Sequence, residues 1–159
     1  MWSIKEQQEL EQILKKYPPD RKLSAVMPAL YLAQRDKNWL DDADIAAVAE
    51  ALDISVTHVH SIIGFYTLYR KEPVGKYMMQ VCTDLPCALR GAEDFYHRLC
   101  ERMGVPHGGT TADNKFTVES VVCLAACDKA PCMQINLEYY ENLTDEQIDK
   151  VVAELRKKG

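Results

Sequence analysis

Two stretches of similar build decide the fold: residues 76–87, KYMMQVCTDLPC, and residues 116–127, FTVESVVCLAAC. In each, an extended apolar run leads into a cysteine, and a second cysteine follows after four residues in the first stretch and three in the second. The runs predict two β-strands, each followed by a cysteine loop. If the strands are neighbours in one sheet, both loops lie at one edge and the four thiols converge.

The remaining segments of this half predict an α/β domain. A helix is expected from Ala88 to Met103, a loop over 104–115, and a hairpin of short strands in PCMQIN and LEYYEN, residues 131–142. Thr144 and Gln147 form a capping-box pattern that begins a last helix. The order strand, helix, strand, strand, strand, helix predicts a thioredoxin-like domain over residues 73–159.

Residues 1–72 contain no cysteine and show helical periodicity throughout. Helices are expected over 3–17, from residue 20, over 41–52, and after a cap at Asp53 or Ser55. Pro28 is expected to kink the second helix or to mark its restart, because proline donates no N–H. Pro73 and Gly75 punctuate the boundary. The predicted fold class is therefore α+β, an N-terminal helical bundle followed by the thioredoxin-like domain.

Composition narrows the class of protein. The chain has 159 residues, 47% hydrophobic and 27% charged, which is typical of a globular protein, and its net charge of −5 argues against nucleic-acid binding. The charged N-terminus lacks a signal-peptide pattern, and no apolar run has the roughly 18 residues that span a bilayer. We therefore expect a cytoplasmic protein, in which clustered cysteines bind metal or do redox work rather than form disulfides.

The cysteine spacing favours an iron–sulfur cluster. Soft thiolates select iron–sulfur clusters, Zn²⁺ or Cu(I). The pair Cys82 and Cys87 is separated from the pair Cys123 and Cys127 by 35 residues. Structural zinc usually takes cysteines that are closer together within each pair, whereas two wider pairs suit the four ligands of a 2Fe–2S cluster. The spacing is neither the plant-type ferredoxin run nor the C-x-x-C of a dithiol enzyme. A zinc-stabilised interaction module and a dithiol or disulfide-bonded domain remain the alternatives.

Two further cysteines lie outside these pairs. Cys100 falls on the inner face of the predicted helix and is expected to be a buried structural thiol. Cys132 follows Pro131 at a predicted strand start, and its nearness to the second pair makes substitution for a ligand conceivable, although we expect it outside the ligand set. Cys87 lies at a helix start, where backbone N–H groups favour a thiolate. Ala125 and Ala126 keep the second loop small, so that backbone amides can reach cluster sulfurs.

Three stretches of the sequence, two of which contain the paired cysteines, resemble a known family. YPPDRKLSAVMPALYLAQ (17–34), GFYTLYRKEPVGKYMMQVCTDLPCALRGAE (64–93) and CLAACDKAPCMQIN (123–136) resemble the thioredoxin-like 2Fe–2S subunit of NADH dehydrogenase, respiratory complex I. The resemblance covers nearly the whole chain and implies that the cluster ligands are Cys82, Cys87, Cys123 and Cys127. Ala125 departs from the family, which usually has glycine there, and Cys132 stands where the family often has an aliphatic residue.

The resemblance also implies a partner. In this family the subunit pairs with a flavoprotein that binds FMN and NADH, accepts one electron from the FMN, and lies in the peripheral arm of a membrane-associated complex. Related subunits serve NAD-linked formate dehydrogenases and hydrogenases. The segment GVPHGG lacks the dinucleotide-binding glycine pattern, so this chain alone is not expected to oxidise NADH. The bundle, with exposed aromatic candidates such as Trp39, is expected to dock the flavoprotein.

Overall fold

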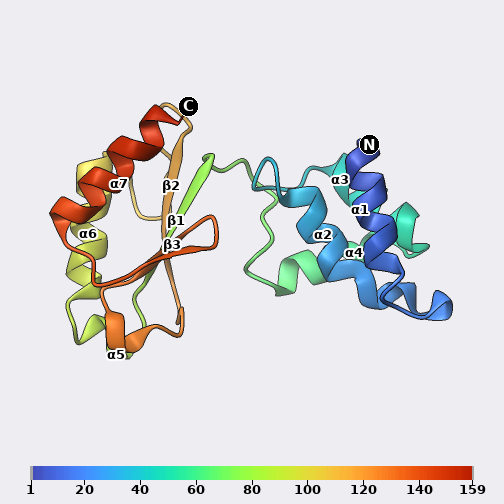
Figure 1. Cartoon of the computed structure of the whole chain (residues 1–159), viewed down its shortest axis with the longest axis horizontal. Helices are drawn as coiled ribbons and strands as arrows, with labels where there is room; N and C mark the ends of the chain where they lie inside the picture. Colours follow the sequence, from blue (N-terminus) through green and yellow to red (C-terminus); the bar gives the residue numbers. More distant parts are fainter. Residues whose placement is uncertain (1, 159) are drawn as a thin grey trace. The chain divides into compact units, whose positions relative to one another are not determined.

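The computed structural model describes residues 2–158 and divides after Pro73 into two compact units, which are described separately (Figure 1). None of the helices among the described residues is long and apolar enough to cross a membrane. The order of elements is the predicted one, with helices first and a mixed α/β unit second, so the predicted α+β class is confirmed. That the two units fold independently stays a prediction.

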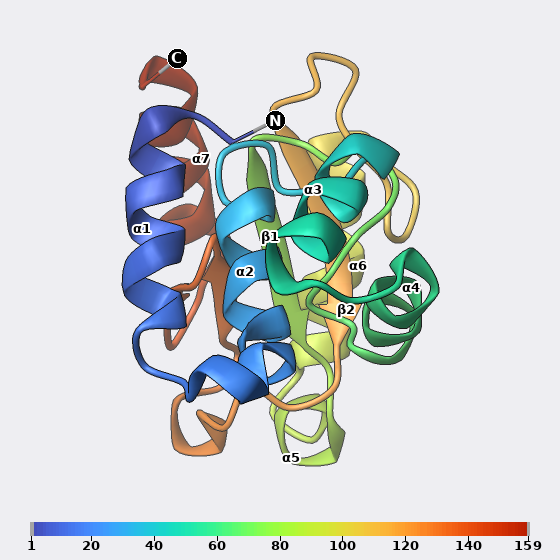
Figure 2. The same cartoon turned by 90° about the vertical axis from the view of Figure 1, so that its right-hand side faces the viewer.

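The first unit is built of helices (Figure 2), and the side chains at their ends explain where several of them begin. Ser3 and Glu6 form a capping box at the start of α1, Asp41 and Asp44 form another at α3, and the Ser55 side chain caps α4. Pro28 lies in the first turn of α2, where its missing N–H is tolerated, and the chain restarts at Val26 as expected. The elements are α1 (Ile4–Leu14), the 3-10 helix η1 (Pro19–Ala25), α2 (Val26–Gln34), α3 (Asp42–Leu52) and α4 (Val56–Phe65).

A buried amide ties the end of this unit to its core. The Gln34 side chain donates to the carbonyl of Leu68 at 2.8 Å and accepts from the backbone N–H of Arg70 at 2.9 Å. The Tyr69 hydroxyl donates to the carbonyl of Met27 at 3.0 Å. Residues 68–70 are thereby fixed against α2, beside a core that includes the fully buried Leu30 and Ile45.

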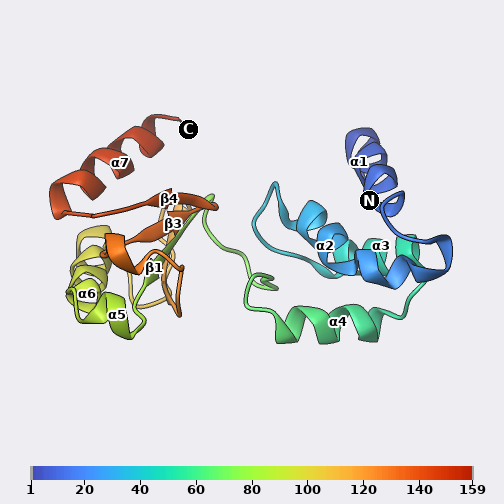
Figure 3. The same cartoon turned by 60° about the horizontal axis from the view of Figure 1, so that its bottom comes forward.

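The second unit contains a four-stranded sheet in the order β2-β1-β3-β4. Strands β1 (Tyr77–Cys82) and β2 (Phe116–Val121) are parallel, whereas β3 (Met133–Ile135) and β4 (Glu138–Tyr140) form the predicted antiparallel hairpin beside β1. Figure 3 shows β3 and β4 running alongside β1. The parallel pair is the feature that matters for the site, because it brings the carboxyl ends of β1 and β2 to one edge.

Helices α6 (Ala92–Met103) and α7 (Asp145–Lys157) lie side by side against this sheet (Figure 1). Arg98 pairs with Asp145 at 3.1 Å, and Arg102 pairs with Asp149, so the two helices are joined at their exposed sides. Their inner sides contribute to the second core, in which each fully buried large apolar side chain stabilises the fold by about 1.5–3 kcal/mol. That core contains Met79, Phe95, Leu99, Phe116, Met133 and Ile148.

The helix expected over Ala88–Met103 ends at Met103 as predicted, but its predicted start is wrong, because the helix begins at Ala92. A short helix, α5 (Leu85–Ala88), ends before Gly91, which has a φ of +84°, and α6 begins at Ala92. Glycine adopts this left-handed conformation readily, and it turns the chain so that the two helices differ in direction. The break places Cys87 in its own short helix rather than in the first turn of α6.

Candidate metal centre

The sheet places both cysteine loops at one edge. The register pairs Cys82 with Val121, the last residues of the parallel strands β1 and β2. Beyond them, the backbone N–H of Thr83 donates to the carbonyl of Val121 at 3.0 Å, which holds the loops together as they leave the sheet. The predicted neighbourhood of the two strands is confirmed, and the loops that follow them lie at the same end of the sheet.

The first loop turns immediately into α5. Asp84 stands at its N-cap, and the backbone N–H of Cys87 donates to the Asp84 carbonyl at 2.9 Å. This single turn returns the chain over the end of β1, so that the Cys87 side chain faces back toward Cys82. Both thiols are buried, with exposed fractions of 0% for Cys87 and 1% for Cys82.

A third thiol, that of Cys132, lies in the same place. Strand β3 runs antiparallel to β1 with Val81 opposite Met133, and the next step of the register is closed by the Cys82 N–H, which donates to the Cys132 carbonyl at 3.1 Å. Directly opposite residues of an antiparallel pair hold their side chains close on one face. The Cys132 residue is completely buried.

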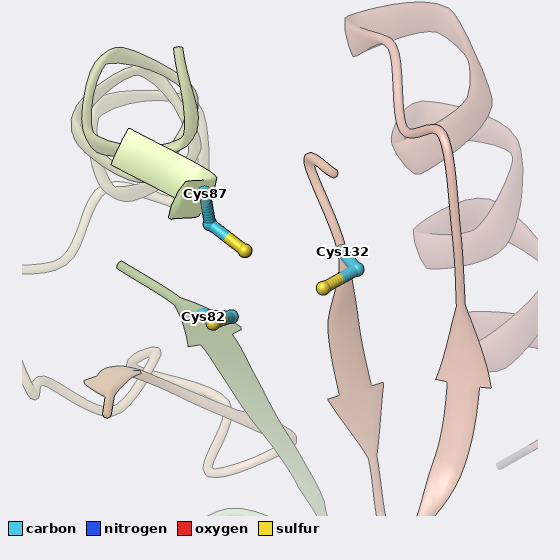
Figure 4. Close-up of side chains that lie close together, drawn as sticks. All are labelled: Cys82, Cys87 and Cys132. Atoms are coloured by element: carbon cyan, nitrogen blue, oxygen red, sulfur yellow. The ribbon is translucent and has the colours of Figure 1, made fainter. Parts of the chain in front are cut away.

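The sulfurs of Cys82, Cys87 and Cys132 all lie within 4.8 Å of one another. Figure 4 shows the Cys87 and Cys132 side chains pointing toward each other across the end of β1. They come from three different elements: a strand end, a single-turn helix, and the start of the hairpin. Sequence reasoning anticipates the first two thiols, and only the register between β1 and β3 reveals the third.

The second cysteine loop wraps over this group with its backbone. Cys123 and Ala125 both have positive φ, +55° and +57°, so successive peptide N–H groups turn toward one side of the chain. The backbone N–H groups of Leu124 and Cys123, together with that of Asp84 from the first loop, bond to the sulfur of Cys82. The Tyr139 hydroxyl anchors the loop from outside by donating to the Leu124 carbonyl at 2.8 Å.

The two thiols of this loop lie outside the close group of three. Cys123 is exposed, and Cys127 is half-buried at the start of the 3-10 helix η2 (Cys127–Lys129). The structure therefore brings together two of the four predicted ligands and positions the loop that carries the other two. The complete set of Cys82, Cys87, Cys123 and Cys127 stays a prediction.

The electrostatics of the three close thiols differ. Burial raises the pKa of Cys82, but the backbone N–H groups of Asp84 and Leu124 outweigh it and hold that pKa below the ordinary value. Burial, reinforced by the adjacent Cys82 thiolate, raises the pKa of Cys87 far above its ordinary range. Burial and the Cys82 charge also raise the pKa of Cys132. Cys82 is thus the first of the three to bear a negative charge.

Cys100 is placed differently. It is buried on α6, 3% exposed, in the core formed with the sheet, and is not part of the thiol group. Burial raises the pKa of its thiol, which keeps it neutral.

The donor set fits a thiophilic metal group. The close thiols are soft ligands, they are shielded from water, and backbone N–H groups already point at one of their sulfurs. Sulfurs arranged tetrahedrally around a metal at about 2.3 Å lie about 3.8 Å apart, which is compatible with three sulfurs that all lie within 4.8 Å of one another. A small adjustment of side chains is enough for two of these thiols to share one metal.

Comparison with known proteins agrees with this geometry. The family model for thioredoxin-like 2Fe-2S ferredoxins matches residues 10–156. The E subunit of NADH-quinone oxidoreductase from Rickettsia typhi is 42% identical over 146 residues, covering 91% of this chain and 85% of that protein. Its namesake from Rickettsia conorii is 44% identical over 148 residues, covering 92% of this chain and 88% of that protein. The namesake from Mycobacterium bovis is 37% identical over 146 residues, which cover 92% of this chain but 57% of that protein.

A solved structure shares the fold. A chain of an NAD⁺-reducing NiFe-hydrogenase in the air-oxidized state superposes with a TM-score of 0.69 at 19% identity. The match covers 89% of this chain but spans only 24% of the hydrogenase chain. The likeness therefore concerns the fold alone, whereas the family match extends over nearly the whole sequence. This chain belongs to the thioredoxin-like 2Fe-2S ferredoxin family.

Proposed function

We propose that this chain is the electron-transfer subunit of an NADH-quinone oxidoreductase and carries one 2Fe–2S cluster. The observation that carries the proposal is the convergence of buried thiols at the carboxyl end of β1, in a chain of this family whose curated relatives bear that subunit's name. When bound, the cluster supplies one-electron redox chemistry without bond making in a substrate.

The ligands we propose are Cys82 and Cys87 from the first loop, with Cys123 and Cys127 from the second. The first two already lie within 4.8 Å of each other. The loop that carries the second two contacts the Cys82 sulfur through its backbone. In this proposal the side chains of Cys123 and Cys127 turn toward the first two thiols and complete a four-thiolate cage.

The surrounding residues prepare the site for a charged group. The backbone N–H groups of Asp84 and Leu124 stabilise negative charge on the Cys82 sulfur, and the same donors stabilise an additional electron close to that sulfur. The buried Ala126 and Ala130 pack beside the thiols and exclude water from their inner side. Because Cys123 is exposed, the site reaches the surface on its outer side, where an electron can enter or leave.

The surface around this opening suits a permanent partner. Leu85, the first residue of α5, and Leu89, which follows its end, have exposed fractions of 69% and 81%, and Val122, which precedes Cys123, has 82%. Large exposed apolar side chains around a site mark an interaction surface. We propose that this surface faces a flavoprotein subunit that binds FMN and NADH, in the peripheral arm of the complex. The electron then travels a short path from flavin to cluster.

Two alternatives differ in what they predict. In the first alternative, the same subunit belongs to an NAD-linked formate dehydrogenase or hydrogenase. The subunits that co-purify with this chain distinguish that parent complex from an NADH-quinone oxidoreductase. In a zinc-stabilised interaction module, the close thiols bind a colourless, redox-inactive ion.

The decisive measurement is iron, acid-labile sulfide and zinc on the full chain purified without oxygen. We expect two irons and two sulfides per chain, a brown colour, and an electron paramagnetic resonance (EPR) signal after reduction with dithionite. Zinc in place of iron and sulfide would overturn the proposal.

A further inference from the structure

Besides the four proposed ligands, the cluster site contains a fifth thiol, that of Cys132. We propose that Cys132 is a reserve ligand, which binds iron in place of Cys87 when the Cys87 thiol is lost. The inference rests on the proposed function, since it concerns the same cluster. The family resemblance assigns no role to this position.

The Cys132 sulfur is close enough to the other thiols to bind the same metal. This sulfur, like that of Cys87, lies within 4.8 Å of the Cys82 sulfur. Thiolates sharing one tetrahedral metal lie about 3.8 Å apart, given a metal–sulfur bond of about 2.3 Å. The Cys82 and Cys132 sulfurs therefore need to approach by no more than about 1 Å to share a metal.

The backbone holds Cys132 in place independently of Cys87. The Cys82 N–H donates to the Cys132 carbonyl at 3.1 Å, and Met133 continues the ladder opposite Val81. Cys87, in contrast, belongs to the single turn of α5. Replacing Cys87 by alanine removes one sulfur and leaves the β1–β3 ladder intact. The vacated volume lies where Figure 4 shows the Cys132 sulfur pointing.

The exchange is a simple ligand substitution. In a chain without the Cys87 thiol, the S–H bond of Cys132 would break, its sulfur would bind iron at the position left vacant by Cys87 or displace a water from it, and the proton would pass to solvent. No electron is transferred, and the oxidation states of iron and sulfur do not change. The number of thiolates around the cluster stays at four.

The test compares full-length variants purified without oxygen and assayed for iron, sulfide and EPR after reduction. Cys87→Ala is expected to keep a 2Fe–2S cluster with iron and sulfide near the wild-type ratio and with shifted g values, because one ligand has moved. The double variant Cys87→Ala with Cys132→Val is expected to lose the cluster. The matched control, Cys87→Ala with Cys100→Ala, removes a buried thiol outside the group and is expected to behave like Cys87→Ala.

Each failure has its own signature. A wild-type chain without iron and sulfide would overturn the proposed function itself. A loaded wild type with a Cys87→Ala variant that shows no cluster signal would overturn the reserve role alone, whatever the double variant does. Cys132→Val by itself is expected to keep the wild-type spectrum, and loss of the cluster in that variant would show that Cys132 is a resident ligand instead. Far-ultraviolet circular dichroism of every variant identifies any loss of fold.

Discussion

Cys82 and Cys132 lie directly opposite each other at the end of the β1–β3 ladder, joined by a hydrogen bond of 3.1 Å from the Cys82 N–H to the Cys132 carbonyl. The sheet itself, rather than a loop, thus fixes two of the three close thiols. Cys87 completes the group from a single helical turn, and the second cysteine loop covers it with backbone N–H groups. The site thus combines two thiols fixed by the β1–β3 ladder with a short helix and a loop that cover them.

The second cysteine loop carries backbone strain at Ala125, and replacing this residue by glycine is expected to relieve the strain. Ala125 has a φ of +57° and an exposed side chain, so the methyl group adds a steric cost and no packing. A non-glycine residue in this conformation costs about 1 kcal/mol. We expect Ala125→Gly to raise the free energy of unfolding of the cluster-free chain by up to that amount, measured by denaturant titration.

The neighbouring alanine provides the control for this prediction. Ala126 has a φ of −123° and is buried among the cysteines. Ala126→Gly relieves no strain and loosens the chain, so it is expected to lower stability by about 0.5–1 kcal/mol. Equal effects of the two substitutions would show that the φ of Ala125 has no energetic consequence.

The features that can be predicted from sequence are those set by local chemistry. The capping box of Thr144 and Gln147, the restart near Pro28 and the two strands that lead into the cysteine loops all follow from neighbouring residues. The break at Gly91 is not predicted, because a glycine inside a helical pattern gives no sign that it adopts positive φ. The place of Cys132 depends on a strand register between segments about 50 residues apart, which periodicity does not encode.

The buried Gln34 amide is expected to be important for the stability of the first unit. Gln34→Met keeps the volume and helix propensity but removes the donor to the Leu68 carbonyl and the acceptor for the Arg70 N–H. Loss of a hydrogen bond to a buried backbone group costs about 1–3 kcal/mol. Denaturant titration of the full chain should therefore show a destabilised first unit with an unchanged cluster spectrum. An unfolding midpoint equal to that of the wild type would contradict this role.

The isolated chain is expected not to oxidise NADH. Its glycine-containing segment GVPHGG forms the turn after α6 rather than the strand-to-helix loop of a dinucleotide site. The measurement is reduction of ferricyanide by NADH, with the loaded chain alone and with its flavoprotein partner added. We expect no activity above background until the partner is present. NADH-dependent turnover by the pure chain would place a nucleotide site on it.

The second unit is expected to fold and bind its cluster without the first. A chain starting at Pro73 retains the sheet, both covering helices and all six cysteines. Its core, which includes Met79, Phe95 and Phe116, draws on residues of this unit alone. We expect this fragment to give the wild-type EPR signal and cooperative unfolding. An unfolded fragment that cannot assemble the cluster would show that the two units share one folding core.

The last prediction concerns how the first unit binds the flavoprotein. The unit has no cysteine, but it leaves a large apolar side chain in water at the end of α4, where Phe65 is 77% exposed and Leu68 follows with 45%. Trp39, expected from sequence as an exposed aromatic, is instead half-buried, with the Lys37 ammonium 5.0 Å from its ring. Phe65 is therefore the better anchor, since aromatic side chains dominate binding energy when a partner buries them.

We expect Phe65→Ser to weaken binding of the purified flavoprotein by about 30-fold, the effect of losing about 2 kcal/mol at an anchor residue. The cluster spectrum and the stability of the free chain should change little, because the Phe65 ring lies outside the core of the first unit. Ile4→Ser is the matched control, since Ile4 is 78% exposed at the start of α1, far along the chain from α4. Affinities measured by titration calorimetry decide: unchanged binding in Phe65→Ser, or an equal loss in Ile4→Ser, would rule out a specific docking role for the end of α4.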